Sequence, residues 1–133
     1  MNRKILVLDI DGTLVNDKKE ITPKTKEKLM EMQKAGHVLM LATGRPTPGA
    51  ARFVKELKLD EYGGYLLSYN GGRIINCKTK EVMYQKVLPK EVIPKLYAFA
   101  KAHKCGIITY EKDTVILGNG IDQYIEWEAK LNQ

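Results

Sequence analysis

Long apolar runs and cysteines are both scarce in this sequence. No stretch approaches the ~20 apolar residues that a membrane-spanning helix needs, so we expect no membrane association. The first four residues include the basic Arg3 and Lys4, but the apolar run that follows covers only residues 5–8 before Asp9. So short a run argues against a signal peptide. The two cysteines, Cys77 and Cys105, have no metal-ligand spacing and are too few for a disulfide framework. We therefore expect reduced thiols in a cytoplasmic protein.

Aromatic residues are also few, and they do not alternate with the basic residues. They make up 8% of the sequence, although the formal net charge is +6. Proteins that bind single-stranded nucleic acids combine basic grooves with stacking aromatic rings, whereas the lysines here alternate with glutamate, as in residues 24–28. We therefore expect a solvated basic surface with no nucleic-acid partner. Such a surface can still attract phosphorylated small molecules.

The first half of the chain alternates predicted strands and helices. Apolar runs predict three buried strands, at residues 4–9, 38–42 and 65–68. Thr22 and Pro23 suit the start of a helix and Gly36 suits its end, while apolar spacing predicts a second helix around residues 50–57. This order is typical of the α/β class, and it predicts a parallel sheet of three strands with right-handed helical crossovers.

After Asn70 the pattern changes to that of an α+β unit. The predicted elements are short strands at 73–76 and 81–86, a helix around 93–100, a hairpin with strands at 106–110 and 114–117, and a last helix at 124–131. Pro94 is compatible with its helix only in the first turn, and we expect Cys105 to pack beneath the hairpin. We place the domain boundary between residues 80 and 81, which gives a core portion, 1–80, and a partial α+β domain, 81–133.

The strongest chemical signal is the run Asp9-Ile10-Asp11-Gly12-Thr13, directly after the first predicted strand. Ligand sites of open α/β sheets lie at the carboxyl ends of the strands. Two neighbouring carboxylates there repel each other unless a cation or a bound proton compensates, and Gly12 allows a sharp turn. The pattern favours a nucleophile and an acid–base partner beside a metal. The alternative is an aspartate-rich turn that caps a local N–H group.

A second signal, Thr43-Gly44-Arg45-Pro46, follows the second predicted strand. A hydroxyl group beside backbone N–H groups is a natural cradle for phosphate, so we expect Thr43 and Gly44 to bind one. The alternative is an ordinary loop threonine. Arg45 either binds an anionic substrate or anchors the loop.

A third signal, Ser68-Tyr69-Asn70-Gly71-Gly72, ends the third predicted strand. Asn70 either donates to the substrate or holds the neighbouring loops. Because Asn-Gly favours turns on backbone grounds alone, a simple turn is an equally good interpretation.

The three motifs together resemble those of the haloacid dehalogenase superfamily, in particular its Cof-type, sugar-phosphatase-like subgroup, class IIB. The Asp9–Thr13 run resembles the first signature of the family, Thr43 lies in a run similar to the second, and Asn70-Gly71 resembles the Asn-Gly signature of the subgroup. The resemblance implies the N-terminal portion of a Rossmann-like core. It also implies that the α+β segment is the first part of a cap domain, which closes over the site and selects the substrate.

The resemblance also implies a role for each motif residue. Asp9 would attack phosphorus and form an aspartyl-phosphate, and Asp11 would serve as general acid and then as general base. Mg²⁺ would bind the Asp9 carboxylate and the backbone carbonyl of Asp11. The residues implied to contact phosphate or substrate are Gly12, Thr43, Gly44, Arg45 and Asn70. The implied reaction is Mg²⁺-dependent hydrolysis of small phosphorylated metabolites such as sugar phosphates.

Two later signatures of the family have no match in this sequence. One is a lysine that steadies the nucleophile, and the other is an acidic pair that completes the metal site. Asp60, Asp113 and Asp122 do not follow a buried strand in a paired arrangement. We therefore expect a truncated form with weak Mg²⁺ binding and impaired or no activity. A flanking strand is missing too, so the first strand would present an exposed apolar edge, and we expect a homodimer that covers it.

Two other functions stay open at this stage. A non-catalytic binding module would keep the phosphate cradle and would bind phosphate without turnover. A phospho-acceptor of the response-regulator kind also uses a strand-end aspartate with Mg²⁺. The position of Asp9 after the first strand argues against the latter, since such receivers carry their acceptor on a later strand.

Overall fold

A computed structural model describes residues 2–111, 114–120 and 123–131. Its contacts divide the chain into two units, Met1–Lys86 (unit 1) and Val87–Gln133 (unit 2). The division lies after Lys86 rather than after Lys80, where we had placed it, because strand β5 (Val82–Gln85) pairs with β4 (Arg73–Asn76) and so belongs to the first unit.

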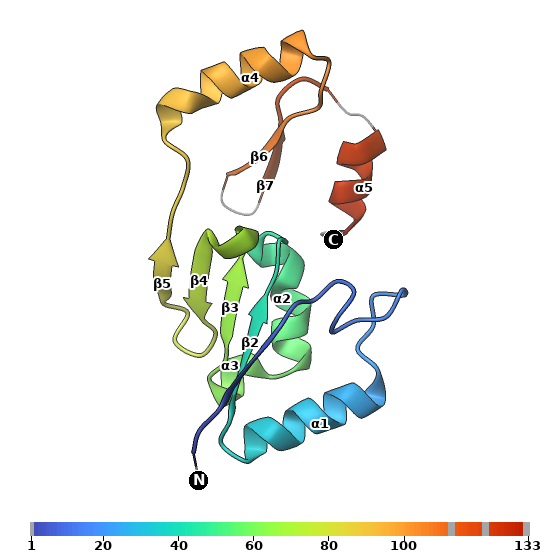
Figure 1. Cartoon of the computed structure of the whole chain (residues 1–133), viewed down its shortest axis with the longest axis vertical. Helices are drawn as coiled ribbons and strands as arrows, with labels where there is room; N and C mark the ends of the chain where they lie inside the picture. Colours follow the sequence, from blue (N-terminus) through green and yellow to red (C-terminus); the bar gives the residue numbers. More distant parts are fainter. Residues whose placement is uncertain (1, 112–113, 121–122, 132–133) are drawn as a thin grey trace. The chain divides into compact units, whose positions relative to one another are not determined.

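Unit 1 is built on a five-stranded sheet with the strand order β1-β2-β3-β4-β5. Strands β1 (Ile5–Leu8), β2 (Val38–Ala42) and β3 (Tyr65–Ser68) are parallel, which confirms the predicted α/β core. Strands β4 and β5 continue the same sheet: β4 runs antiparallel to β3, and β5 runs antiparallel to β4 (Figure 1). We had expected them to begin the α+β segment. The short connections between β3, β4 and β5 instead favour antiparallel pairing with the neighbouring strand.

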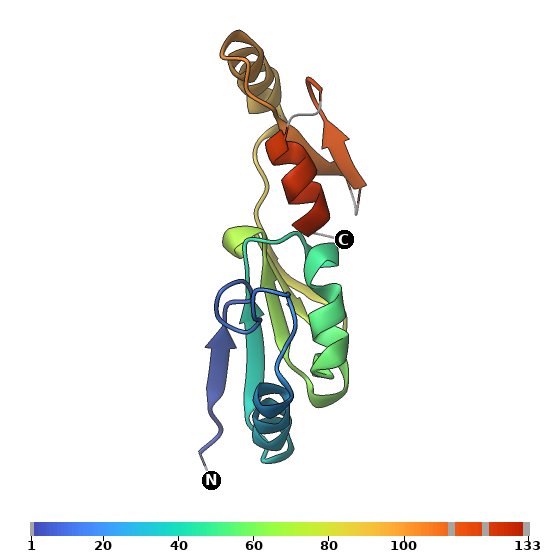
Figure 2. The same ribbon diagram turned by 90° about the vertical axis from the view of Figure 1, so that its right-hand side faces the viewer.

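The helices of unit 1 cover one face of this sheet. They are α1 (Pro23–Lys34), α2 (Thr47–Glu56) and the short α3 (Leu59–Tyr62), and a 3₁₀ turn, Tyr69–Gly71, follows β3. Thr22 caps α1 as predicted, since its hydroxyl oxygen accepts from the Thr25 N–H. Gly36 follows α1 with φ +86°, a conformation that glycine adopts without strain. Figure 2 shows α1 and α2 on the same side of the sheet.

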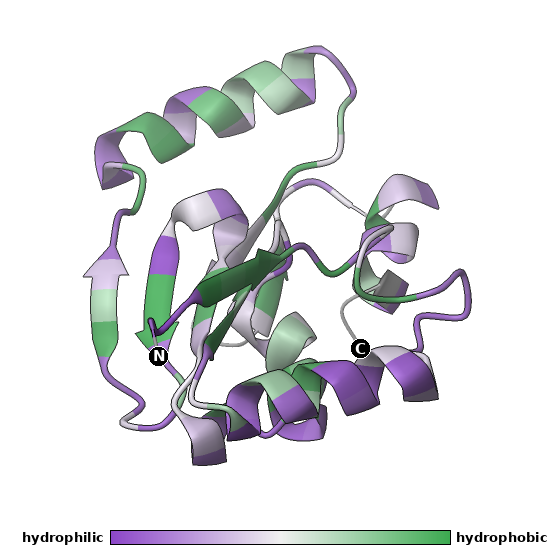
Figure 3. Ribbon diagram, turned by 60° about the horizontal axis from the view of Figure 1, so that its bottom comes forward, coloured by the Kyte–Doolittle hydropathy of each residue, from purple (hydrophilic) through white to green (hydrophobic). Residues whose placement is uncertain are grey.

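The core lies between these helices and the sheet. Leu39 and Leu41 point to one face of β2 because they are two residues apart, and both are fully buried. They cluster with Leu29 of α1, Phe53 of α2 and Leu66 of β3. Figure 3 shows the hydrophobic colouring concentrated on the strands, with hydrophilic segments along the helices. The apolar side chains of the βαβ pattern therefore form one core. The carboxyl ends of the parallel strands lie together at one edge of the sheet.

Strand β1 forms an exposed edge of the sheet. Among the described residues, β2 is its only hydrogen-bonded neighbour. Ile5 and Val7 of β1 are more than half exposed, at 61% and 52%. This confirms the exposed edge predicted from the sequence.

Unit 2 contains two helices and a hairpin. Helix α4 (Ile93–Ala102) follows a 3₁₀ turn at Lys90–Val92, strands β6 (Ile108–Glu111) and β7 (Thr114–Leu117) form the antiparallel hairpin, and α5 (Gln123–Leu131) comes last. Pro94 lies in the first turn of α4, as predicted. Our expectation that Cys105 packs beneath the hairpin is wrong, because this residue is exposed.

No helix in the described part of the chain combines the length and the apolar character needed to cross a bilayer.

Candidate active site

The loop after β1 places two carboxylates at the carboxyl end of the sheet. Ile10 between them is fully buried in the core. The Ile10 carbonyl accepts from the N–H groups of Leu14 and Val15, both at 3.1 Å, and so closes a tight turn. Gly12 has φ +77°, which an L side chain rarely adopts. Asp9 is exposed and Asp11 is partly buried. The buried Ile10 thus anchors a turn that presents both aspartates away from the core.

The loop after β2 is fastened to the loop after β3. Thr43 is buried, and its hydroxyl oxygen accepts from the Arg45 N–H at 3.1 Å. Two backbone bonds join the loops: the Asn70 N–H donates to the Thr43 carbonyl at 3.1 Å, and the Tyr69 N–H donates to the Arg45 carbonyl at 3.0 Å. These bonds bring the Thr43 and Asn70 motifs together, as expected for strands whose carboxyl ends meet at one edge.

Asn70 packs directly against Gly44. A Cβ atom built on Gly44 would lie 3.0 Å from Oδ1 of Asn70, so the site accepts only glycine without adjustment. Tyr69 and Asn70 both have φ +53°, in the left-handed region that costs a non-glycine residue roughly 1–2 kcal/mol. Strained backbone of this kind concentrates at functional sites. The contact of the Asn70 side chain with Gly44 is compatible with the interpretation in which Asn70 holds the neighbouring loops, and its left-handed backbone is compatible with a simple turn.

Arg45 is bound to Asp11 rather than exposed to a substrate. The guanidinium is 2% exposed and grips both carboxylate oxygens: Nε donates to Oδ2 at 2.7 Å and Nη2 donates to Oδ1 at 2.8 Å. Its Nη1 donates to the Gly49 carbonyl at 3.1 Å. A two-point bond between guanidinium and carboxylate fixes both position and orientation. Arg45 therefore links the loops after β1 and β2, which is the anchoring alternative.

A second cation, Lys19, also contacts Asp11. Its Nζ donates to Oδ1 of Asp11 at 2.9 Å. We did not predict this contact, because Lys18 and Lys19 are adjacent in a loop and nothing in the sequence distinguishes them. The hydrogen bond from Arg45, followed in effect by the one from Lys19, lowers the pKa of Asp11 from 3.8 to about 2 against the opposing effect of burial. Asp11 is thus ionised at neutral pH in this arrangement.

The residues present fit one side of a magnesium site. Mg²⁺ takes about six oxygen ligands in a near-octahedral arrangement. The Asp9 carboxylate and the backbone carbonyl of Asp11 are donors of this kind, whereas the Asp11 carboxylate already accepts from Arg45 and Lys19. Within residues 2–111, 114–120 and 123–131, no three His, Cys, Asp or Glu side chains gather as at a metal site built by protein alone. Mg²⁺ held by Asp9 and Asp11 would need further oxygens from water or substrate.

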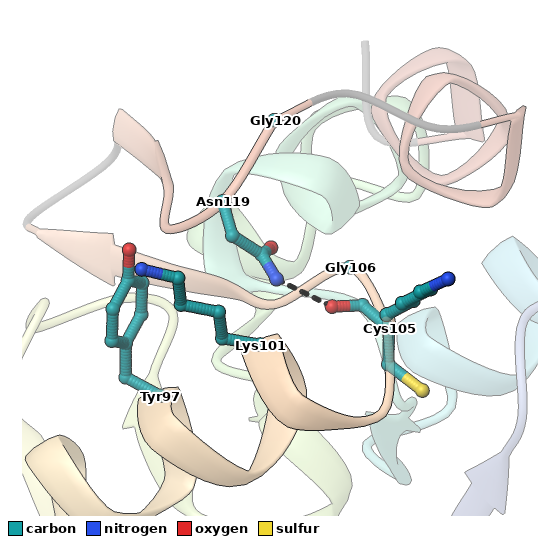
Figure 4. Close-up of a pocket in the computed structure, with 7 residues that line it drawn as sticks. Tyr97, Lys101, Cys105, Gly106, Asn119 and Gly120 are labelled. Carbon is teal, nitrogen blue, oxygen red and sulfur yellow. Dashed lines mark hydrogen bonds between the residues drawn. The ribbon is translucent and has the colours of Figure 1, made fainter.

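A hollow of about 460 Å³ lies in unit 2, and none of the predicted site residues is among the residues that line it. It is lined by Tyr97, Lys101, Lys104, Cys105, Gly106, Asn119 and Gly120. Figure 4 shows Asn119 bridging the chain there, with its Nδ2 donating to the Cys105 carbonyl at 2.6 Å. The described residues that line the hollow include no carboxylate, whereas the loops of unit 1 carry two, so the chemistry points to those loops as the candidate active site.

Comparisons with known proteins place the chain in one family. A family model described as haloacid dehalogenase-like hydrolase matches residues 6–133. The crystal structure of a haloacid dehalogenase-like hydrolase from Bacteroides thetaiotaomicron is 47% identical with a TM-score of 0.91, over 98% of this chain and 49% of that one. The Bacillus subtilis protein YxeH is 30% identical over 98% of this chain and 48% of its own length.

A third relative is named for its activity. Pyridoxal phosphate phosphatase YbhA of Escherichia coli is 31% identical over 62% of this chain and 32% of its own length. The chain spans about half the length of YxeH and of the Bacteroides protein, and about a third of YbhA. The similarity to YxeH and to the Bacteroides protein extends over 98% of this chain but over only about half of each of those two proteins.

Proposed function

The chain belongs to the haloacid dehalogenase-like hydrolase family, and we propose that it supplies the nucleophile-bearing part of a Mg²⁺-dependent phosphatase for small phosphorylated metabolites such as sugar phosphates. One observation carries the proposal. The loop with Asp9 and Asp11 is joined through Arg45 to the loop with Thr43, at the carboxyl ends of adjacent parallel strands. The activity for which YbhA is named, on the phosphate ester of a small metabolite, supports the substrate class.

In the proposed reaction, a carboxylate oxygen of Asp9 attacks phosphorus, and the bond between phosphorus and the alcohol oxygen breaks. Asp11 gives a proton to the leaving alcohol and later accepts one from the water that hydrolyses the aspartyl-phosphate. The low pKa of Asp11 keeps its carboxylate ionised, as the second task requires, but also makes it a weak base. The first task requires that Asp11 carry a proton, and therefore that its bonds to Arg45 or Lys19 weaken when the substrate binds.

The phosphate group would be held by the loop after β2. The Thr43 hydroxyl can donate its hydrogen while its oxygen accepts from Arg45, because a hydroxyl has one donor and two acceptor positions. Gly44 leaves its backbone N–H unobstructed by a side chain, and Gly12, with φ +77°, allows the turn of the first loop. When bound, Mg²⁺ would neutralise charge on the phosphate oxygens, with Asp9 and the Asp11 carbonyl as its protein ligands.

The alternative is a phosphate-binding module without turnover. It is favoured by the same low pKa of Asp11 and by the partial donor set for Mg²⁺ among the described residues. Such a module would use Thr43 and Gly44 but would not need Asp9 as a nucleophile.

We also propose a homodimer that covers the edge of β1. The exposure of Ile5 and Val7 supports it, since an unpaired apolar strand edge readily pairs with another strand. Light scattering should then give twice the chain mass for the native protein and the monomer mass for Val7→Lys. A monomeric native protein would exclude this dimer.

The test of the enzymatic proposal is hydrolysis of an aryl phosphate by the purified chain with Mg²⁺. We expect slow turnover, reduced by several orders of magnitude relative to a complete site, that disappears in Asp9→Asn and persists in Lys18→Met. Turnover that survives Asp9→Asn would contradict the assignment of the nucleophile. Phosphate binding without turnover would identify the binding module instead.

A further inference from the structure

Lys19 has a backbone conformation that lysine seldom adopts. Its φ is +61°, which costs roughly 1–2 kcal/mol for a residue with a Cβ atom. Hydrogen bonds close the loop around it: the Lys19 N–H donates to the Asn16 carbonyl at 2.9 Å, and the Asn16 N–H donates to the Glu20 carbonyl at 3.0 Å. The Glu20 N–H donates to Oδ1 of Asn16 at 2.9 Å. The loop thus holds Lys19 in a defined but unfavourable conformation.

Helix α2 fastens this loop to the core. Nη2 of Arg52 donates to the Lys19 carbonyl at 3.1 Å. The Arg52 guanidinium lies 4.5 Å from the centre of the Phe53 ring, and that of Arg45 lies 5.5 Å from the same centre. Phe53 is fully buried. One rigid ring therefore supports both arginines, and the contacts run from Phe53 through Arg45 to Asp11, and from Phe53 through Arg52 to Lys19.

The two cations on Asp11 differ in exposure. Arg45 is 2% exposed and cannot be reached by a substrate, whereas Lys19 is 40% exposed. An ammonium group has three N–H donors, and Lys19 donates one of them to Asp11. Asp11, Arg45 and Lys19 together carry one net positive charge, which offsets the negative charge of the Asp9 carboxylate in the same loop when an anion approaches.

We propose that Lys19 binds an anionic oxygen of the phosphate group of the substrate while it remains next to Asp11. This inference rests on the proposed function, because it assigns the phosphate to the same loops. It transfers to Lys19 the anion-binding role that the sequence allowed for Arg45. Because Arg52 and Phe53 already hold the loop, little conformational freedom is lost when the anion binds.

A surface ion pair is the competing explanation. Exposed pairs of this kind contribute only about 0–1 kcal/mol to stability and need have no function. The two explanations differ in what happens when phosphate is present, since only anion binding makes the affinity for phosphate depend on Lys19.

The experiment is an isothermal calorimetric titration of the chain with inorganic phosphate in the presence of Mg²⁺, which measures the affinity for phosphate. Lys19→Met should weaken binding about tenfold or more, the loss expected for one hydrogen bond to a charged group, whereas Lys19→Arg should keep it within about threefold, because the cation is retained. Lys18→Met is the matched control and should bind like the native chain. Lys19→Gly relieves the backbone strain, yet should bind as weakly as Lys19→Met, because both lack the ammonium group.

The outcomes separate the two proposals. Equal affinities of the native chain and Lys19→Met would overturn the role of Lys19 and leave the proposed function intact. Binding that is insensitive to Lys19 but lost in Thr43→Val would locate the phosphate at the cradle alone. No binding by the native chain at any attainable concentration would overturn both the role of Lys19 and the proposed phosphate site.

Discussion

The two units of this chain treat similar side chains differently. The sequence contains two phenylalanines: Phe53 of unit 1 is 1% exposed and supports two arginines, whereas Phe99 of unit 2 is 62% exposed and stacks on His103. Unit 1 contains a continuous core. Among the described residues of unit 2, Ala100 and Ile125 are the buried apolar side chains. Unit 1, which has the continuous core, is therefore the unit in which a buried ring holds the charged side chains of Arg45 and Arg52 in place.

The largest expected effect comes from removing the phenyl ring of Phe53, and the matched removal of the Phe99 ring in unit 2 should have little effect. Phe53→Ala should lower the free energy of unfolding of unit 1 by about 3–5 kcal/mol, because it leaves a cavity in the core. Phe99→Ala should change the free energy of unfolding of unit 2 by about 0.5 kcal/mol or less, as expected for a surface site. Urea denaturation measures both, and Phe53→Leu serves if the alanine variant does not fold. Equal losses in the two variants would break the comparison.

Asp11→Asn should have the next largest effect, and that effect should depend on pH. At neutral pH we expect a loss of about 1–3 kcal/mol, because the hydrogen bonds to Arg45 and Lys19 lose their charge assistance. Since folding lowers the pKa of Asp11 from 3.8 to about 2, its stabilising contribution is complete above pH 3.8 and declines as the pH falls towards 2.

Denaturation of the native chain and of Asp11→Asn at several pH values measures this. The difference between the two should shrink as the pH falls through this window. A difference that stays constant down to pH 2 would contradict the ion pair.

A smaller effect is expected at the helix starts. Thr22 caps α1 with its side chain, whereas α4 begins after Val92 without a side-chain cap. Thr22→Ala should therefore lower the free energy of unfolding by about 1 kcal/mol. Val92→Ala removes no side-chain cap, so it should cause no comparable loss of free energy at the start of α4. Thermal unfolding of the two variants provides the comparison, and an unchanged midpoint for Thr22→Ala would exclude the cap.

The smallest perturbation is chemical labelling of the cysteines. Burial raises the pKa of Cys77 in unit 1 to about 11, whereas Cys105 in unit 2 is exposed. Because the thiolate is the reactive form, a thiol reagent at pH 8 should modify Cys105 in the native chain and Cys77 only after denaturant is added. Rapid modification of both cysteines in the native chain would show that unit 1 opens readily.

The sequence was sufficient to predict the parallel strands, the cap of α1 and the three loops of the site, because apolar periodicity and turn residues are local signals. It did not predict that β4 and β5 extend the sheet, since strand pairing depends on partners beyond the local pattern. The contact between Lys19 and Asp11 was also missed. It arises from a left-handed backbone at Lys19 and from Arg52 on another element, neither of which leaves a recognisable pattern in the sequence.

In the proposed function, the loops of unit 1 form a phosphate site. Amide NMR spectra of the chain, titrated with inorganic phosphate and Mg²⁺, test it most directly. We predict that the saturable shifts fall on residues 9–13, 43–45 and 69–71 and at Lys19, and that the amides of unit 2 stay in place. Saturable shifts confined to unit 2, around Lys101 and Lys104, or the absence of any saturable shift, would contradict the claim.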